Sequence, residues 1–183
     1  FRAGKIKACE AVKKSKKLLQ FVLDDGNFYI STFDANNHYE DNIKIIEKWD
    51  PDKVWTAVLF DADNGDCLYL KRFRMEATKR WQNYIGENPK SKLLLLTDTP
   101  FPRFEVSLAP TTAPDGTEMQ RPPLEIDAEE FIAVKGFKAK GKRVTTFDVL
   151  NVKELEPTRF PEPEKEEGED GEGDDAEDTN LDP

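Results

Sequence analysis

Short apolar runs, separated by turns rich in Asp, Asn and Gly, recur along most of the chain. Residues 18–23 and 28–33 are rich in Leu, β-branched and aromatic side chains and flank an Asp-Asp-Gly-Asn turn, which predicts a β-hairpin. Residues 54–60 and 67–73 predict a second hairpin around the acidic turn at 61–66. The first part of the chain is therefore predicted to consist of β-strands.

Two further hairpins are predicted by the same kind of pattern. One joins residues 93–97 to residues 103–108 through an Asp-Thr-Pro-Phe-Pro turn. The other joins residues 131–134 to residues 144–149 across a loop rich in lysine.

The four hairpins form two units, at about residues 18–73 and 92–150, related by a shift of about 76 residues. Four strands in each unit predict a mainly β fold built from blades of a propeller-like array. Each blade of such an array buries its faces against its neighbours, so two blades alone leave apolar faces uncovered. We therefore expect the chain to be a piece of a longer protein.

Three segments interrupt the hairpin pattern. Met75 to Ile85 favours a short helix that ends at Gly86, with Pro89 behind it. Residues 42–49 fit either a strand or a helix. Residues 109–123, rich in Pro, Thr and Gly, predict a long loop.

Charge is distributed unevenly along the chain. The 183 residues carry 27 basic and 37 acidic side chains, a net charge of -10. Residues 161–183 hold 12 of the acidic side chains and one lysine, so residues 1–160 keep 26 basic and 25 acidic ones, a net charge of +1. The tail has too few apolar side chains to offset its ordering entropy, so we expect residues 1–160 to form one domain and 161–183 a disordered acidic tail. The acidic pI thus describes the tail and does not argue against a nucleic-acid partner.

The sequence also predicts a location. No apolar stretch approaches the ~20 residues that span a bilayer, and no signal peptide is recognisable, so we expect no membrane partner. Cys9 and Cys67 lack the spacing of a disulfide framework or a metal site, and we expect two buried free thiols in a reducing cytoplasm.

Candidate catalytic and metal-binding residues are few. His38 is the single histidine, so no ordinary His/Cys zinc set can form. Asp61, Asp63 and Asp66 are spaced like half of a calcium loop, but Arg72 stands where that loop needs a glutamate, so a hairpin turn is favoured. No nucleophile motif or phosphate-binding glycine motif occurs. We therefore expect this chain to have no catalysis, cofactor or metal of its own.

Residues 135–143 are the main candidate for a functional site. The segment Lys-Gly-Phe-Lys-Ala-Lys-Gly-Lys-Arg holds five cations and no carboxylate. Its two glycines allow a sharp turn and a close approach to a ligand. Phosphate binding by cations gains from counterion release and needs no contact with bases, although a solvated charged turn also fits the pattern. We predict that its cations contact DNA phosphates: Lys135, Lys138, Lys140, Lys142 and Arg143.

Other cations extend this predicted surface. Lys71 and Arg72 lie in a Lys-Arg-Phe-Arg run at the end of a predicted strand, and Arg103 follows the Pro-Phe-Pro turn. We include these three residues in the predicted DNA-binding set. The segment 79–81, Lys-Arg-Trp, could combine backbone contact with stacking, but an amphipathic helix face explains it as well. The lysines at 13–17 fit a solvated run.

Several longer motifs resemble one protein family. Residues 131–147, Phe-Ile-Ala-Val-Lys-Gly-Phe-Lys-Ala-Lys-Gly-Lys-Arg-Val-Thr-Thr-Phe, and Glu154-Leu-Glu-Pro157 resemble the end of the A subunit of topoisomerase IV of the Bacteroidetes type. The segments Asn37-His-Tyr-Glu-Asp-Asn-Ile43 and Gly86-Glu-Asn-Pro89 are similar to it as well. The resemblance covers most of residues 18–160.

This resemblance implies a C-terminal β-pinwheel domain, a propeller-like disc whose basic rim binds and bends duplex DNA. It implies that the domain presents DNA to the catalytic core of a type IIA topoisomerase and shapes the preference between decatenation and supercoil relaxation. The implied partners are duplex DNA, the rest of the topoisomerase IV A subunit and the separate ATPase component of the enzyme, its B subunit, in the bacterial cytoplasm at the nucleoid. ATP and Mg²⁺ would serve the parent enzyme and not this chain.

Two sequence features of type IIA topoisomerase A subunits are absent from this chain, and their absence makes the expected function more specific. The DNA-cleaving tyrosine of such enzymes follows an arginine, and none of Tyr29, Tyr39, Tyr69 and Tyr84 does, so we expect no DNA cleavage here. The gyrase box Gln-Arg-Arg-Gly-Gly-Lys-Gly is absent, which favours topoisomerase IV over the alternative of a gyrase A-type DNA-wrapping domain.

Alternatives from other classes stay open. A protein-docking module could use the same basic loop to hold an acidic partner, and an independent enzyme is the least favoured hypothesis. The acidic tail could compete with DNA for the basic loop or serve only as a solubilising tail. The alignment of the two units places residues 135–143 at the turn that residues 61–66 fill in the first unit, so DNA contact is expected at one edge of the disc.

Overall fold

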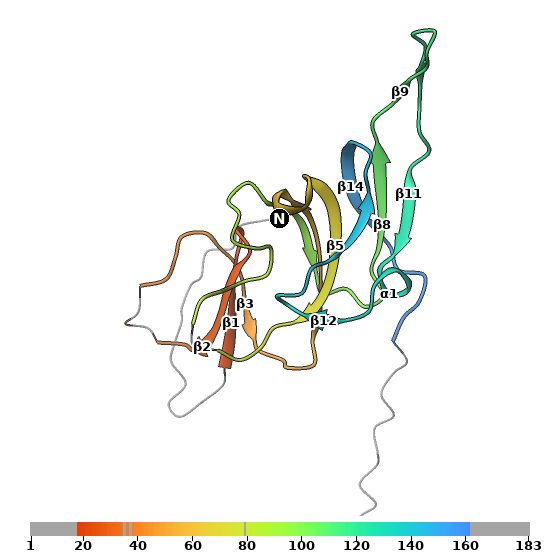
Figure 1. Cartoon of the computed structure of the whole chain (residues 1–183). Coiled ribbons are helices and arrows are strands. Elements are labelled where there is room, and N and C mark those ends of the chain that lie inside the picture. Colours follow the sequence, from red (N-terminus) through yellow and green to blue (C-terminus); the bar gives the residue numbers. More distant parts are fainter. Residues whose placement is uncertain (1–17, 35, 37, 79, 162–183) are drawn as a thin grey trace, which may run out of the picture.

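The computed structural model describes residues 18–161, except residues 35, 37 and 79. Its strands form three sheets that lie face to face, with a two-stranded arm projecting from one end (Figure 1). The predicted acidic tail from residue 162 onward, Cys9 and the lysines at 13–17 lie outside the described residues.

Sheet A is the first layer and has the strand order β3-β1-β2-β6. Its strands are β1 (Leu18–Leu23), β2 (Asn27–Thr32), β3 (Ile43–Lys48) and β6 (Gln82–Asn83). Sheet B is the central layer, ordered β12-β5-β4-β7, with β13 also paired to β5. Its strands are β4 (Val54–Asp61), β5 (Cys67–Arg74), β7 (Lys92–Thr97), β12 (Lys135–Gly136) and β13 (Lys142–Thr145).

Sheet C is the third layer, ordered β11-β8-β14. Its strands are β8 (Arg103–Leu108), β11 (Leu124–Asp127) and β14 (Val149–Leu155). The arm pairs β9 (Thr111–Thr112) with β10 (Glu118–Met119), and the helical turns are η1 (Ala62–Asn64) and α1 (Ala128–Phe131). The mainly β fold class predicted from the sequence is confirmed.

The burial of each strand follows its place in the stack. β4 alternates between two hydrophobic cores: Trp55, Ala57 and Leu59 pack toward sheet A, and Val58 packs toward sheet C. A strand buried on both faces can be apolar at successive positions, as β4 is. β8 instead alternates buried and half-buried residues, because only one face of sheet C meets a core.

The first two predicted hairpins are confirmed, as β1–β2 and β4–β5. Residues 42–49, left open between strand and helix, contain strand β3. The predicted helix from Met75 to Ile85 is wrong, because its described part holds the short strand β6. Met75 and Tyr84 are both buried in the core between sheets A and B, and an extended connection carries them there.

The third predicted hairpin is wrong although both strands exist. β7 pairs with β4 in sheet B, whereas β8 pairs with β11 and β14 in sheet C. The connection contains Pro100 and Pro102, which cannot donate ladder hydrogen bonds, and Phe101 with a φ of 53°. It therefore transfers the chain from one sheet to the next instead of reversing it within a sheet.

The fourth predicted hairpin is also wrong. Residues 131–134 form no strand, because Asp127 caps α1 by accepting hydrogen bonds from the backbone N–H groups of Glu129 and Glu130. Residues 144–149 divide between β13, paired with β5, and β14, paired with β8. Sheet B thus combines strands from both predicted units, and the long loop predicted at 109–123 contains the arm.

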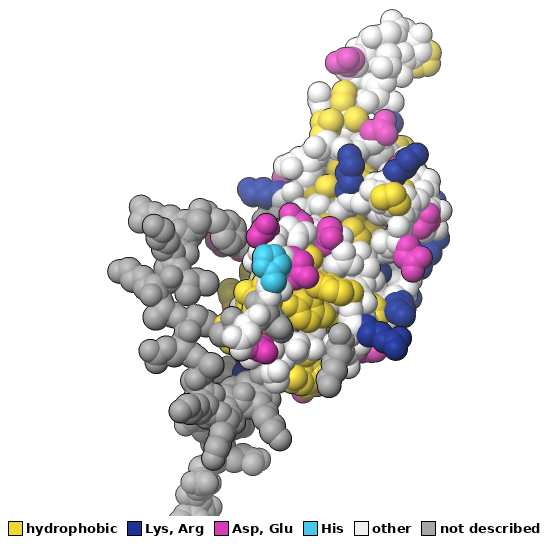
Figure 2. All heavy atoms as spheres, turned by 90° about the vertical axis from the view of Figure 1, so that its left-hand side faces the viewer, with side chains coloured by type: hydrophobic (Ala, Val, Ile, Leu, Met, Phe, Trp, Pro, Cys, Tyr) yellow, Lys and Arg dark blue, Asp and Glu magenta, His cyan; other side chains and the backbone are white. Residues whose placement is uncertain are grey.

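The outer faces of the stack carry different side chains. On sheet C, Arg103 pairs with Glu125 at 2.9 Å, and Leu150 of β14 is 67% exposed. Across the outer face of sheet A, Phe21 lies in register between Ile46 of β3 and Tyr29 of β2. Tyr29 stacks on Phe21 at 4.6 Å between ring centroids and meets Trp81 edge-on at 4.3 Å. Figure 2, which views the molecule from this side, shows hydrophobic side chains gathered beside the single histidine, with Asp and Glu around them.

Candidate nucleic-acid interface

The basic loop, residues 135–143, lies along one edge of the central sheet. Lys135 and Gly136 pair in parallel with Phe73 and Arg74 at the end of β5, and Lys142 and Arg143 pair antiparallel with Leu70 and Tyr69. The loop therefore does not project as the tip of a hairpin. It wraps the free edge of β5, and this fixes both of its ends.

The middle of the loop is anchored as well. The Phe137 ring is buried at 4% exposure and meets Phe28 of sheet A edge-on, with ring centroids 5.3 Å apart. A Cβ added at Gly141 would lie 2.6 Å from the Leu70 carbonyl oxygen and 2.7 Å from Cγ of Lys71. Only glycine allows the backbone to approach β5 this closely.

All five loop cations are exposed. Lys140 hydrogen-bonds to Oδ1 of Asn64 and lies 5.5 Å from the centroid of the Tyr69 ring. Lys142 donates to the Phe131 carbonyl at 3.0 Å and lies 4.3 Å from that ring's centroid. The ion pairs found among the described residues all use other cations. The loop therefore forms an exposed basic ridge, because its charges are not neutralised by neighbouring carboxylates.

Lys71, predicted to contact DNA, does not belong to this exposed ridge. Its side chain is 9% exposed, and Nζ donates to the carbonyl oxygens of Tyr84 at 2.5 Å and Phe137 at 2.8 Å. Burial lowers the pKa of Lys71 to about 8, although the nearby carboxylate of Asp61 opposes this shift. An ammonium group enclosed in this way cannot reach a phosphate, so the assignment of Lys71 to DNA contact is corrected.

The predicted DNA contact of Arg72 is corrected for a similar reason, whereas that of Arg103 is not tested by the structure. Arg72 is 9% exposed and points to the opposite face of β5, where it donates to the Ile132 carbonyl at 3.4 Å and lies 3.9 Å from a Glu129 oxygen. Arg103 is half-buried and pairs with Glu125 at 2.9 Å on sheet C, away from the basic ridge, and its contact with DNA stays a prediction.

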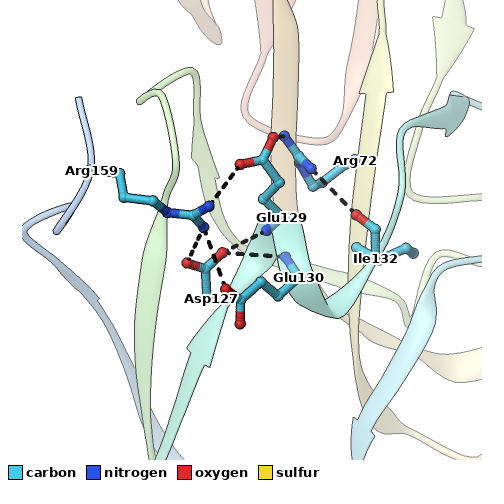
Figure 3. A network of polar contacts seen from close by, with 6 residues as sticks. All are labelled: Arg72, Asp127, Glu129, Glu130, Ile132 and Arg159. Carbon is cyan, nitrogen blue, oxygen red and sulfur yellow. Dashed lines mark hydrogen bonds and ion pairs between the residues drawn. The ribbon is translucent and has the colours of Figure 1, made fainter. Parts of the chain in front are cut away.

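Figure 3 shows the network that Arg72 joins around α1. Arg159 approaches Asp127 at 2.5 Å, Glu129 at 3.5 Å and Glu130 at 3.9 Å. Partial burial would raise the pKa of Asp127, but the Arg159 guanidinium and the N–H groups of Glu129 and Glu130 outweigh it and hold this pKa below its usual value. The network ties the end of the described chain to α1.

The acidic turn 61–66 lies beside the basic ridge, not at an equivalent place in another unit. Asp61 caps η1, and Gly65 takes a φ of 80°, as the predicted tight turn requires. An open groove of about 1290 Å³ separates the ridge from the turn and the segment 82–94. Its lining combines four lysines (Lys71, Lys92, Lys138 and Lys140) with five carboxylates: Asp24, Asp25, Asp61, Asp63 and Glu87. The side of the ridge that faces away from these carboxylates is therefore the more favourable approach for phosphate.

One surface beside the ridge was given too little weight in the prediction from the sequence. Arg80 and Trp81 line a hollow of about 450 Å³ together with Lys138. Arg80 is exposed, and Trp81 is 46% exposed. The pattern of cations and an aromatic ring at 79–81 indicates such a surface. The alternative of an amphipathic helix face fitted the same pattern, so the surface was not predicted. Arg80 therefore adds an exposed cation beside the basic ridge.

The other candidates for chemistry remain single side chains. Cys67 is a half-buried free thiol whose Sγ lies 3.4 Å from the Gly65 carbonyl, and His38 is exposed in the loop between β2 and β3. Within the described residues, no three His, Cys, Asp or Glu side chains gather in a metal-binding arrangement. Nor does any helix of the described chain have the length and apolar character to cross a membrane.

Comparison with known proteins identifies the family. The family model for the topoisomerase C-terminal domain of the Bacteroidota matches residues 9–156. No curated protein and no solved structure shows a significant match to the chain. The match includes all three sheets and the basic ridge, and it agrees with the resemblance carried by residues 131–147. The chain belongs to the Bacteroidota family of topoisomerase C-terminal domains.

Proposed function

We propose that this domain binds duplex DNA without sequence preference, through the phosphates, as an accessory part of a topoisomerase IV A subunit. The observation that carries the proposal is the basic ridge. Five exposed cations lie on a loop paired to β5 at both ends and anchored by a buried ring in its middle. Cations held on a rigid edge suit phosphate contact, because binding releases counterions and orders little of the protein.

We also propose a finer role, which membership of the family suggests. A domain joined to a topoisomerase and able to hold a duplex can present a DNA segment to the catalytic core. We propose that the parent enzyme uses ATP and Mg²⁺ with a separate ATPase component, its B subunit, in the bacterial cytoplasm, and that the ridge influences decatenation. Within the part of the chain that the structure describes, the basic ridge occupies one edge of one sheet, and this supports local DNA contact over gyrase-type wrapping.

Salt dependence tests DNA binding by the ridge. The logarithm of the binding constant for a short duplex should fall linearly with the logarithm of salt concentration. Replacing Lys135, Lys138, Lys140, Lys142 and Arg143 with Ala should weaken binding at low salt. The slope should shrink by about 0.9 for each phosphate that the variant no longer neutralises.

The matched control removes the same number of charges elsewhere. Five exposed lysines outside the ridge serve for this purpose: Lys44, Lys48, Lys90, Lys92 and Lys153. Equal losses of affinity in both variants would indicate a general charge effect and would refute the ridge as the site. A pull-down of an acidic protein partner that duplex DNA cannot displace would support protein docking by the loop instead.

A second contact is favoured by the outer face of sheet A. In the row of Ile46, Phe21, Tyr29 and Trp81 that crosses this sheet, Ile46 is 52% exposed and Trp81 is 46% exposed. Burial and the charge of Glu40 raise the pKa of Tyr29 in this row to about 12. Large exposed apolar patches mark protein contacts. We therefore propose that this face packs against another part of the parent protein, to which a C-terminal domain is joined.

Charge substitution tests this second contact. Ile46→Glu combined with Trp81→Glu should weaken association with the rest of the parent protein supplied as a separate chain. The control Lys153→Glu places a new carboxylate on sheet C. Association that survives in the double variant as well as in the control would exclude sheet A as the contact.

A further inference from the structure

The side chain of Lys71, which is 9% exposed, joins the basic ridge to the core. Its two acceptors are backbone carbonyls from distant parts of the chain, Phe137 in the loop and Tyr84 after β6. Both residues also place their rings in the core, where each contacts the Phe28 ring, at 5.3 Å and 6.2 Å between centroids. Lys71 therefore links two segments that no strand pairing joins directly.

A buried lysine at this position needs an explanation. Burying an ammonium group is unfavourable, and an apolar side chain of similar length would fill the same space without that penalty. The lowered pKa of Lys71 reflects this penalty. Charged groups face it from several elements: Asp61 at the end of β4, and Lys138 and Lys140 in the loop. What the lysine adds over an apolar residue is a pair of charge-assisted hydrogen bonds that hold the loop backbone.

The loop would be mobile without such anchors. It contains two glycines, and four of its five cations are lysines, whose side chains have high conformational entropy. Lys71 donates a hydrogen bond to the Phe137 carbonyl of the loop, and its aliphatic stem lies close to Gly141. Lys138 and Lys140 lie between these two contact points in the sequence. Ordering the backbone before DNA arrives lowers the entropy lost on binding.

We propose that Lys71 is a positioning residue for DNA contact, whose hydrogen bonds to the Phe137 and Tyr84 carbonyls hold the basic ridge in its binding shape. This inference rests on the proposed DNA-binding function. It assigns Lys71 a role different from phosphate contact, the role predicted from the sequence.

The test compares Lys71→Met with Lys71→Arg in the full chain. Methionine keeps the apolar stem and removes the donors, whereas arginine keeps the charge and donors and has the adjoining groove for its larger head. Affinity for a short duplex should fall about tenfold in Lys71→Met, the scale expected when a few side chains must be ordered on binding, and should recover partly in Lys71→Arg. In Lys71→Met the amides of residues 137–141 should exchange hydrogen faster, while those of sheet C keep their wild-type rates.

A pair of glycine substitutions probes the loop without removing any charge. Gly141→Ala forces a Cβ against Leu70 and Lys71, whereas a Cβ at Gly116, on the projecting arm and outside the ridge, meets nothing within 4 Å. Gly141→Ala should weaken DNA binding as Lys71→Met does, and the control Gly116→Ala should leave it unchanged.

The outcomes separate this inference from the proposed function. If the wild-type chain binds no duplex at low salt, the proposed function fails, and the exchange rates of residues 137–141 still decide whether Lys71 holds the loop. Wild-type exchange rates in Lys71→Met would overturn the inference. Unchanged affinity in Lys71→Met, beside a loss in Lys138→Ala, would overturn it equally while leaving the ridge as the DNA site.

Discussion

Lys140 of the basic ridge donates a hydrogen bond to the side chain of Asn64, in the middle of the acidic turn. The most basic and one of the most acidic loops of the domain are therefore in contact across the rim of the groove. This places Asp63, the neighbour of Asn64, where its charge opposes the approach of a phosphate to the ridge.

Neutralising that charge should strengthen DNA binding. Asp63→Asn retains an oxygen that can accept the hydrogen bond from Asn88, which Asp63 accepts at 2.7 Å. We expect a rise in duplex affinity of roughly twofold to threefold at low salt that disappears at high salt, because surface charge effects are screened. Glu118→Gln on the projecting arm is the control and should change nothing. An increase that persists at high salt would contradict an electrostatic origin.

The acidic tail offers a second electrostatic test. If its 12 carboxylates compete with DNA for the ridge, a chain ending at Phe160 should bind duplex more tightly than the full chain, with a changed salt slope. Ending at Phe160 keeps Arg159 and its contacts with α1. Equal affinities and equal slopes would leave only a solubilising role for the tail.

Asp127 should make folding stability depend on pH. Its pKa is lowered in the folded state, so its contribution to the free energy of unfolding is complete above the unfolded-state pKa and is lost as pH falls through the folded-state pKa. Asp127→Ala also removes the cap of α1, and we expect a loss of about 1 kcal/mol at pH 7. Urea denaturation of wild type and variant should give curves that converge below pH 4. A difference that stays constant from pH 7 to pH 2 would exclude the carboxylate as its cause.

Alanine substitutions at Gly26 and Gly116 distinguish the cost of backbone strain from the cost of steric overlap. Both have positive φ, 84° and 87°, but a Cβ at Gly26 would lie 2.6 Å from Cγ1 of Ile85, whereas a Cβ at Gly116 meets nothing. We expect Gly116→Ala to lower the free energy of unfolding by about 1 kcal/mol and Gly26→Ala by roughly 2–4 kcal/mol, since overpacking adds to strain. Chemical denaturation measures both values. Equal losses of unfolding free energy in the two variants would show that the Ile85 side chain moves aside at no energetic cost.

Local patterns predicted local pairings well. β1–β2 and β4–β5 follow from apolar runs around short Gly-containing turns, because each pair closes within a few residues. The Asp127 cap of α1 was also readable in Asp-Ala-Glu-Glu, but the apolar residues at 131–134 suggested a strand instead. The helix predicted near 75–85 failed because Met75 and Tyr84 enter the core from an extended segment.

The candidate site was predicted in composition but not in geometry. The five exposed cations were identified from charge alone, and their exposure agrees with that reading. Lys71 stands in the same kind of basic run as they do, yet it faces the core between sheets A and B. Which face of β5 a cation occupies depends on its register in the sheet, and a one-residue step reverses the direction of a side chain.

By itself, the sequence determined the mainly β class, the two local hairpins, the family, and a basic loop set apart from an acidic tail. These features depend on composition and on contacts between residues close along the chain. The tertiary structure alone decided that β7 joins β4, that β8 joins β11 and β14, and that the basic loop wraps β5 beside the acidic turn. Strands of similar pattern can satisfy their backbone hydrogen bonds with many partners, and only the packing of three layers around two cores selects among them.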